Sequence, residues 1–570
     1  MKITAVRTKS GETVPIGKFT VLVGPNNVGK SRTLRDIHDY FVDGPGANCV
    51  ILDEVIIEKP KTFDELFLGL QKAPDPTHTD RDRVSGILSN LTSGTFIQID
   101  TKHHQERFER NGDFRFAFGS ISKFRVSYLD AESRLKVAKA TKSHNPHVQP
   151  PGNLLQGLFA AQDDTETVLR KAFSETFAMD LRLDYSGMQD LALRVAKRFE
   201  EIPADPRDAY PVLQKYGRLD EQGDGFRSFV GVVLSLLLSQ GRVVLLDEPE
   251  AFLHPAQSRQ LGLWIASHAA TVPGQIIVAT HNASFLSGIL ASGETVDIFR
   301  MNRTGDVTEY ACIPPDATRS LVDSPLLSSQ RVLESIFYRG VVVCEADADR
   351  AVYQTVATRF LSDQETMFVH AHNKQSVPKV VELLRAARIP VAAIVDLDAL
   401  SSAGDLRKLV LSLSDEAAAV EIVQQREHVT GKLGVPTDDD TVREIRERTA
   451  EFLGQLEADE HDLSGARGAL NRLRKLASDW YDLKTKGVDA LPSDAQEVCR
   501  ALIESCAAQG LFLVPVGELE CWMDLGTTRK NVWVVQALEA LHAGSAYPPG
   551  LKEFVEKVLA SLRSAGRDSE

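Results

Sequence analysis

The chain has 570 residues, a formal net charge of -14 and 43% hydrophobic residues. This length is too great for one hydrophobic core, so we expect two or three domains, and the composition is typical of ordinary globular proteins. The acidic balance excludes a protein that coats DNA along its whole surface, because such binding depends on neutralising phosphates with Lys and Arg. Any contact with nucleic acid must therefore be local.

Membrane and disulfide chemistry are not expected. No apolar run approaches the roughly 20 residues of a membrane helix, and the start of the chain lacks the basic-then-apolar layout of a signal peptide. The six cysteines form no CxxC pair and no Cys/His cluster with zinc spacing. We therefore expect reduced thiols, no membrane contact and a cytoplasmic location.

A nucleotide-binding loop stands near the start of the chain. A β-prone run at 19–23 is followed by the sequence GPNNVGKS at 24–31 and by helical spacing at 31–41. In this strand, loop and helix arrangement, backbone N–H groups turn toward the phosphates, the lysine reaches the terminal phosphates and the serine hydroxyl ligates Mg²⁺. The pattern predicts ATP as a cofactor, and the predicted binding residues of the loop are Asn26, Asn27, Gly29, Lys30 and Ser31.

A second strand with acids at its end matches this loop. The sequence GRVVLLDEPE at 241–250 is an apolar run ending in two acids, as expected of a buried parallel strand that delivers its ligands at its carboxyl end. We expect Asp247 to hold Mg²⁺ and Glu248 to polarise the attacking water. After another apolar strand at 275–279, His281 lies where a sensor of the γ-phosphate is expected.

Over roughly residues 1–300 these motifs resemble the ATP-binding-cassette (ABC) type of ATPase, in the branch shared with DNA-repair and chromosome-maintenance proteins. The resemblance implies a nucleotide held between two heads. Residues 222–228, before an apolar helical stretch, can offer a helix start to the γ-phosphate, although an ordinary turn into a core helix remains the alternative. Residues 153–203 read as amphipathic helices, either a dimerisation insert or a lobe packed on its own ATPase.

A new α/β pattern begins after a connector at 306–335. An apolar strand run ends at Glu345, a helix is expected from Asp349 onward, and a later apolar strand ends in Asp396 and Asp398. Strands that alternate with helices predict a parallel sheet whose strand ends meet at one edge. Carboxylates gathered there would be hard oxygen ligands for Mg²⁺ or Mn²⁺, and such an ion can polarise a phosphodiester. Helix capping is the alternative role of these acids.

This second pattern resembles the TOPRIM domain of topoisomerases, primases and certain nucleases. An ABC-type ATPase followed by a TOPRIM domain resembles the overcoming-lysogenisation-defect (OLD) nucleases, which include the nuclease subunit of the Gabija defence system. The resemblance implies an ATP-regulated, metal-dependent DNA endonuclease or nickase acting against phage or foreign DNA. A homodimer or larger homo-oligomer is expected, and a partner protein encoded nearby is left open.

The C-terminal part supplies further candidates. The sequence GLFLVPVGELE at 510–520 reads as another strand ending in acids and resembles the late acidic motif that completes a two-metal site in OLD nucleases. Glu518 or Glu520 is the candidate ligand, with Glu520 favoured. Upstream, Lys484 lies in a basic loop that could hold the scissile phosphate. A solvated lysine turn is the alternative.

Two features depart from the family. The chain has His372 and Asn373 before Lys374, where a glycine commonly precedes the polar residue after the second TOPRIM strand. Residues 400–480 form a long charged insertion, with helices expected at 416–426, 440–456 and 464–480. A non-cutting, ATP-dependent sensor or scaffold, whose TOPRIM-like domain binds a partner protein or nucleic acid, is therefore the rival interpretation. A topoisomerase or primase is a weaker one.

The predicted fold is α/β, with an ABC-type ATPase head (1–305, helical insert 153–203), a connector (306–335) and a TOPRIM-like parallel domain (336–570, helical insertion 400–480). The predicted catalytic residues are Glu248, Glu345, Asp349, Asp396, Asp398, Lys484 and Glu520. The predicted metal ligands are Ser31, Asp247, Glu345, Asp349, Asp396, Asp398, Glu518 and Glu520.

Overall fold

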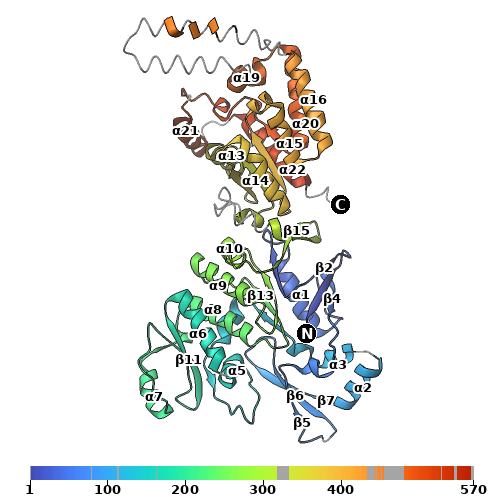
Figure 1. Ribbon diagram of the computed structural model, residues 1–570, viewed down its shortest axis with the longest axis vertical. Coiled ribbons are helices and arrows are strands. Elements are labelled where there is room, and N and C mark those ends of the chain that lie inside the picture. Colours follow the sequence, from blue (N-terminus) through green and yellow to red (C-terminus); the bar gives the residue numbers. More distant parts are fainter. Residues whose placement is uncertain are drawn as a thin grey trace. The chain divides into compact units, whose positions relative to one another are not determined.

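A computed structural model describes residues 2–317, 333–432 and 481–565, together with a few residues between 443 and 454. The exceptions within these ranges are Thr79, Gln162, Thr528 and residues 112–113 and 545–547. The chain divides into two compact units, Met1–Phe337 and Tyr338–Glu570 (Figure 1).

The first unit is built around a six-stranded sheet in the order β16-β15-β3-β14-β13-β8. Five of its strands are parallel, and β16 pairs antiparallel with β15. Every residue of β3, β13 and β14 is buried, as their continuous apolar runs predict for a sheet covered on both faces. The strand bounds are Phe19–Val23 (β3), Val126–Leu129 (β8), Val243–Asp247 (β13), Gln275–Ala279 (β14), Asp297–Thr304 (β15) and Val307–Ile313 (β16).

The edge strand β16 lies within the predicted connector 306–335. It forms a hairpin with β15 across a turn at Gly305, whose φ is 60°. Because its backbone N–H and C=O groups pair within the six-stranded sheet, the first unit extends past the predicted boundary at 305. The rest of the connector, 318–332, lies outside the described residues.

Helices and two small antiparallel sheets surround this sheet. Leu34, Ile37 and Phe41 of α1 pack against Val243 and Leu245 of the sheet in one hydrophobic core. The small sheets have the orders β2-β1-β4 and β5-β6-β7. Their strands are Ile3–Thr8 (β1), Thr13–Pro15 (β2), Leu52–Ile57 (β4), Gln71–Pro74 (β5), Asp82–Ile87 (β6) and Gly94–Ile99 (β7). The helices are Lys30–Asp43 (α1), Thr101–Asn111 (α2), Phe114–Ile121 (α3), Ala131–Val137 (α4), Asp224–Leu237 (α8), Pro255–His268 (α9) and Ala283–Ala291 (α10).

The predicted helical insert at 153–203 is only half helical. Two helices, Leu154–Ala160 (α5) and Asp163–Phe177 (α6), are followed by the strands Asp180–Asp184 (β10) and Asp190–Ala196 (β11). These strands pair antiparallel with each other, and β11 also pairs with the short strands β9 (Thr141–Lys142) and β12 (Gly217–Arg218). The helical prediction for the second half is therefore wrong, because strand pairing, mainly between β10 and β11, outweighs the local periodicity. A further helix, Pro206–Leu213 (α7), follows.

The second unit contains a four-stranded sheet in the order β18-β17-β19-β20, and all its neighbouring strands are parallel. Its strands are Gly340–Cys344 (β17), Thr366–His370 (β18), Val391–Val395 (β19) and Leu511–Leu513 (β20). Its helices are Asp347–Phe360 (α13), Val377–Ala386 (α14), Ala403–Leu413 (α15), Glu416–Lys432 (α16), Tyr481–Lys486 (α19), Ser493–Ala508 (α20), Lys530–Ala543 (α21) and Pro549–Ala565 (α22). The predicted α/β fold class is confirmed for both units.

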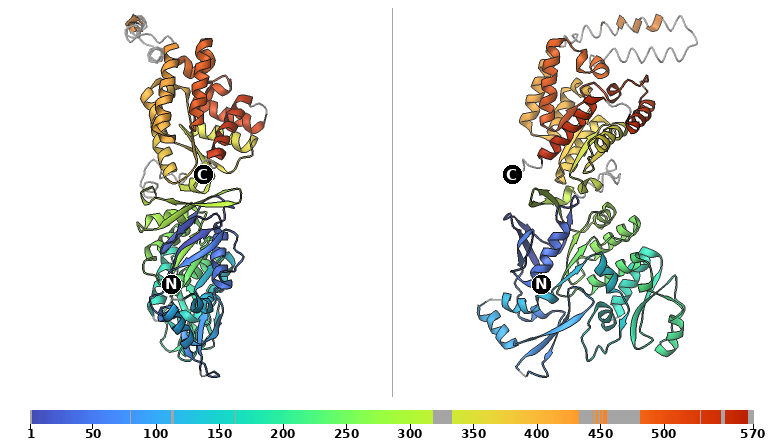
Figure 2. Two further views of the ribbon diagram at one scale, coloured as in Figure 1. Left: turned by 90° about the vertical axis from the view of Figure 1, so that its right-hand side faces the viewer. Right: turned by 180° about the vertical axis from the view of Figure 1, so that it is seen from behind.

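Part of the predicted insertion 400–480 is visible as helices α15 and α16, which include the helix expected at 416–426. Figure 2 shows α16 running beside α20, with which it packs. About half of the helix expected at 440–456 and all of the helix expected at 464–480 lie outside the described residues. In the parts of the chain that are described, none of the helices combines the length and the apolar character needed to cross a membrane.

Candidate nucleotide and metal sites

The phosphate-binding loop lies between β3 and α1. Gly24 and Gly29 have φ angles of 134° and 103°, which glycine adopts without strain. A Cβ atom at Gly24 would lie 2.4 Å from the Met301 carbonyl oxygen, so no larger residue fits there. Lys30 Nζ donates to the carbonyl oxygens of Gly24 and Pro25, each at 2.7 Å. Burial lowers the pKa of Lys30 to about 8.

The predicted magnesium ligands of this site lie together. Ser31 Oγ donates to Asp247 Oδ1 at 2.7 Å, and the Tyr128 hydroxyl donates to Oδ2 at 3.0 Å. Burial raises the pKa of Tyr128, so the phenol remains a hydrogen-bond donor. Asn26 and Asn27 are exposed in the loop. In the sequence, the place of Tyr128 near the end of a strand, β8, is the one sign that it could contact Asp247.

The predicted base and the predicted sensor contact each other directly. Glu248 has a φ of 51°, and its Oε1 lies 2.7 Å from His281 Nδ1. The hydrogen bond from His281 lowers the pKa of Glu248, and the same bond raises the pKa of the imidazole. Glu248 is therefore held as a carboxylate at the end of β13.

Two buried residues that the sequence did not single out support these acids. Glu250 accepts a hydrogen bond from Thr280 Oγ1 at 2.6 Å, and burial raises its pKa to about 7. Arg134 is fully buried and donates to the backbone oxygens of Asp247 at 2.6 Å and Glu248 at 2.9 Å.

Arg134 also reaches the helix that follows the glycine-rich turn. Its Nε donates to Ser228 Oγ at 3.1 Å, in the first turns of α8. The Arg134 guanidinium thus connects the backbone of Asp247 and Glu248 to the start of α8. This helix start is the one that could bind the γ-phosphate of a nucleotide held by a second head.

In the second unit, the two central strands carry the predicted acids. Glu345 follows β17 and Asp396 follows β19, and the Asp396 N–H donates to Glu345 Oε1 at 3.1 Å. Burial raises the pKa of Glu345 to about 7, and burial together with the neighbouring Glu345 raises the pKa of Asp396 well above its ordinary value. Two desolvated carboxylates side by side are stabilised by any cation placed between them.

Asp398 has a different environment, because each of its oxygens contacts a lysine. Lys374 Nζ lies 3.0 Å from Oδ1, and Lys484 Nζ lies 2.9 Å from Oδ2. Although burial opposes ionisation, the two ammonium groups lower the pKa of Asp398. Lys484 Nζ also lies 3.8 Å from Glu518 Oε2. Lys374 was not among the predicted site residues.

The remaining predicted acids lie nearby in the same unit. Asp349 Oδ2 accepts a hydrogen bond from the Ala346 N–H at 2.9 Å, and Asp349 Oδ1 lies 3.3 Å from Lys530 Nζ. Burial disfavours the Lys530 ammonium, but its attraction to Asp349 and other acids raises its pKa. Glu520 Oε2 is buried without a hydrogen-bond partner. Lys530 also escaped prediction.

Close backbone packing positions Lys484. Gly517 has a φ of 108°, and a Cβ atom there would lie 2.1 Å from the Lys484 carbonyl oxygen. Gly517 in turn accepts a hydrogen bond from the Leu397 N–H at 2.9 Å. The loop that precedes Glu518 therefore packs against both the end of β19 and the backbone of Lys484. At the other lysine, His372 takes the bend expected of glycine, with a φ of 70°.

The chemistry of these donors suits a hard divalent cation. The carboxylates of Glu345, Asp396, Glu518 and Glu520 follow three adjacent parallel strands, and the orphaned Glu520 oxygen and the raised pKa values point to missing positive charge. Within the described ranges, however, no three His, Cys, Asp or Glu side chains converge as a ready-made metal site.

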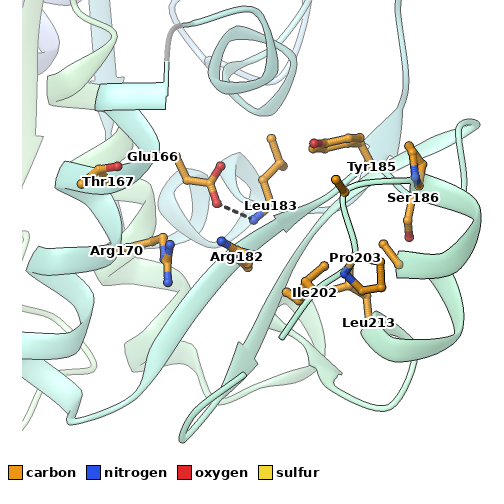
Figure 3. A pocket seen from close by; sticks show the side chains of 13 residues that line it. Glu166, Thr167, Arg170, Arg182, Leu183, Tyr185, Ser186, Ile202, Pro203 and Leu213 are labelled. Carbon is orange, nitrogen blue, oxygen red and sulfur yellow. Dashed lines mark hydrogen bonds between the residues drawn. The ribbon is translucent and has the colours of Figure 1, made fainter. Parts of the chain in front are cut away.

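A separate pocket of about 320 Å³ lies in the first unit between α6, β10 and the segment leading into α7 (Figure 3). Glu166 and Arg170 line it from α6, and Arg182 and Leu183 line it from β10. Glu166 Oε1 accepts a hydrogen bond from the Leu183 N–H at 3.1 Å. None of the nucleotide-site residues described above lines this pocket.

Two protein-family models match the chain. Residues 19–287 match the family described as "AAA domain, putative AbiEii toxin, Type IV TA system". Residues 336–398 match "Overcoming lysogenization defect protein-like, TOPRIM domain". The chain thus joins an ATPase domain to an OLD-like TOPRIM domain, and the predicted resemblance to this organisation is confirmed.

Several solved structures are similar to part of the chain. An SMC head bound to the C-terminal winged-helix domain of ScpA is 14% identical, with a TM-score of 0.32, over 55% of this chain and 97% of that one. The SMC head domain from Thermotoga maritima is 13% identical, with a TM-score of 0.28, over 55% and 100%. An Smc head derived from Pyrococcus furiosus is 11% identical, with a TM-score of 0.31, over 56% and 98%. No curated protein sequence matches significantly.

Proposed function

We propose that this protein is an ATP-regulated, divalent-metal-dependent DNA endonuclease or nickase that acts in defence against phage or foreign DNA. The observation that carries the proposal is the edge of the TOPRIM sheet, where Glu345 and Asp396 lie against each other beside the lysines that contact Asp398. Carboxylates that repel one another suit a bound cation, and lysines suit a phosphate. A pure binding module gains nothing from such buried acids.

The roles of the chain's own groups follow from their positions. Glu345 and Asp396, with Asp349, Glu518 or Glu520, would hold Mg²⁺ or Mn²⁺, which when bound polarises the phosphodiester and activates water. The buried pair at the ends of β17 and β19 would hold such a cation at the edge of the sheet. Lysine ammonium groups beside it then neutralise the charge of the DNA backbone.

ATP acts in the other unit as a regulator of cutting. Lys30 would exchange its two loop carbonyls for the phosphates of ATP, and Ser31 and Asp247 would hold the accompanying Mg²⁺. Glu248, ionised beside His281, accepts the proton of the attacking water. The start of α8 offers free N–H groups to the γ-phosphate on a second copy, so we propose a homodimer or larger homo-oligomer.

The proposal is tested with supercoiled plasmid DNA incubated with Mg²⁺ or Mn²⁺, with and without ATP. We expect nicked or linear product from the wild type, none from Asp396→Asn, and unchanged ATP binding by that variant. Asp489→Asn is the matched control, because Asp489 is an exposed acid of the same unit. Cleavage by metal-loaded Asp396→Asn protein would refute the assignment of the site.

One observation favours a second candidate, a non-cutting ATP-dependent sensor or scaffold that binds a partner protein or nucleic acid. In the described part of the second unit the acids do not converge as a three-ligand group, and lysines already neutralise Asp398 and Asp349. Plasmid that stays intact under all conditions, together with DNA binding that depends on ATP, would support this candidate.

A further inference from the structure

The two aspartates of the DxD motif face opposite kinds of charge. Asp396 lies beside Glu345, whereas Asp398 lies between Lys374 and Lys484, with Nζ to carboxylate oxygen distances of 3.0 Å and 2.9 Å. Lys374 Nζ also lies 3.3 Å from the Asp398 carbonyl oxygen. Both carboxylate oxygens of Asp398 are thus occupied by ammonium groups.

The sum of charges differs accordingly along this edge of the sheet. One carboxylate and two ammonium groups give Asp398, Lys374 and Lys484 a net charge of +1, since −1 + 1 + 1 = +1. Glu518 Oε2, 3.8 Å from Lys484 Nζ, brings the sum to 0 when it is ionised, against −2 for Glu345 and Asp396. Glu345 and Asp396 form an acidic half directly beside them. A cation on the acidic half and a phosphate on the basic half would therefore attract each other as well as the protein.

We infer that Asp398 is not a metal ligand but the anchor of a two-lysine site that binds a backbone phosphate of the DNA strand. This inference rests on the proposed function and assigns Lys374 a role in binding the substrate. Asp398 holds the two lysines at fixed positions, so less side-chain freedom is lost when the phosphate arrives.

Both lysines retain the means to bind an anion. An ammonium group has three N–H donors. Lys484 gives one to Asp398 and keeps two, while Lys374 contacts two oxygens of Asp398 and keeps one. Their side chains are 35% and 22% exposed, so a phosphate can reach them.

The three residues come from three segments that are distant in the sequence and meet at one edge of the sheet. Lys374 follows the bend at His372 after β18, and Asp398 lies in the short 3₁₀ helix Leu397–Ser401 after β19. Lys484 belongs to α19, whose position is fixed by the close approach of Gly517. Both ammonium groups are brought together by their contacts with Asp398.

The first test measures Mn²⁺ binding by electron paramagnetic resonance on the full chain without nucleotide. Asp396→Asn and Asp398→Asn each remove one negative charge and preserve side-chain shape, so a difference between them reports coordination. We expect Asp396→Asn to lose a class of bound Mn²⁺, and Asp398→Asn to keep it with affinity within about threefold of wild type, as expected for a lost charge outside the coordination shell. Equal loss in both variants would overturn the inference alone. Wild-type protein without Asp396-dependent Mn²⁺ binding would overturn the proposed function as well.

The second test measures DNA binding by fluorescence anisotropy in Ca²⁺ at several KCl concentrations. Because both lysines contact the same phosphate, Lys374→Gln and Lys484→Gln should each reduce the magnitude of the slope of log K against log[KCl]. The double variant should reduce it by about 0.9, the value for one lost phosphate contact. Lys379→Gln is the matched control, since Lys379 is exposed on α14 of the same unit. Slopes that stay at the wild-type value in both site variants would overturn the inference, even if Asp398→Asn retains Mn²⁺.

Discussion

Replacing Glu250 with glutamine is expected to remove a pH-dependent weakness of the ATPase unit. Glu250 is 4% exposed, and burial raises its pKa from an ordinary value of 4.5 to about 7. The folded state therefore binds a proton more tightly than the unfolded state does. Glu250 therefore does not lower the free energy of unfolding below about pH 4.5. Its destabilising effect grows as the pH rises toward 7 and is complete above that pH.

The size of this penalty follows from the difference in pKa. A difference of about 2.5 corresponds to about 3 kcal/mol, at about 1.4 kcal/mol for each pH unit. Urea-induced unfolding at about pH 5 and about pH 8 measures this penalty. The transition to follow is the one that shifts when ADP is added, because nucleotide stabilises only the unit that binds it. Because pH 5 already lies above the unfolded pKa, the free-energy difference between Glu250→Gln and wild type should change by about 2.5 kcal/mol in favour of the variant between these pH values.

The exposed Glu294 of the same unit offers a matched control. Glu294→Gln should unfold in parallel with the wild type at every pH. Parallel behaviour of Glu250→Gln would refute the reasoning, since it would mean that Glu250 ionises in the folded protein as it does in the unfolded chain. Glutamine keeps the acceptor for Thr280 Oγ1, so loss of that hydrogen bond does not enter the comparison.

Three further outcomes are expected. Tyr128→Phe removes a hydrogen bond to Asp247, the proposed magnesium ligand, and should weaken Mg-ATP binding by roughly tenfold, about 1.4 kcal/mol, in a fluorescent-nucleotide titration. Unchanged affinity would contradict the contact. Because burial lowers the pKa of Lys30 to about 8, the side chain loses its positive charge above that pH. The affinity for ATP should therefore fall between about pH 7 and pH 9 in the wild type but not in Lys30→Arg. A wild-type affinity that does not change with pH would contradict this. Gly517→Ala should abolish plasmid cleavage and spare ATP binding, because the new Cβ would lie 2.1 Å from the Lys484 carbonyl oxygen. The control Gly544→Ala, which also has a positive φ but no neighbour within 4 Å, should still cut the plasmid. Equal cleavage by both variants would refute the packing argument.

Much of both sites was predictable because their motifs are local. The loop 24–31 needs only a strand before it and a helix after it, and β3 and α1 supply both. The acids at the end of β13 follow an apolar run long enough to indicate a buried parallel strand. In the second unit the same logic predicted that Glu345 and Asp396 meet, because parallel neighbouring strands end at one edge.

The residues that escaped prediction are those that reach a site from distant segments. Tyr128 contacts Asp247 across 119 positions of the chain, and Arg134 contacts its backbone across 113. Neither belongs to a motif, since any buried tyrosine or arginine near a strand end would look the same. The strands at 180–196 were mistaken for helices because the spacing of their apolar residues does not show that they pair with each other, nor that β11 also pairs with β9 and β12 outside the segment.

The amino-acid sequence by itself determined the two-part organisation, the α/β fold class and the kinds of group at each strand end, because side-chain chemistry and the period of apolar residues are local properties. Only the tertiary structure decided which charge each carboxylate meets. Lys484 reaches Asp398 across 86 positions, while Asp396, two residues earlier, turns to Glu345. Residues two apart in a strand share a side, but Asp398 lies in the 3₁₀ helix Leu397–Ser401, where that alternation ends. The packing of remote segments therefore decides whether each acid meets another acid or a lysine.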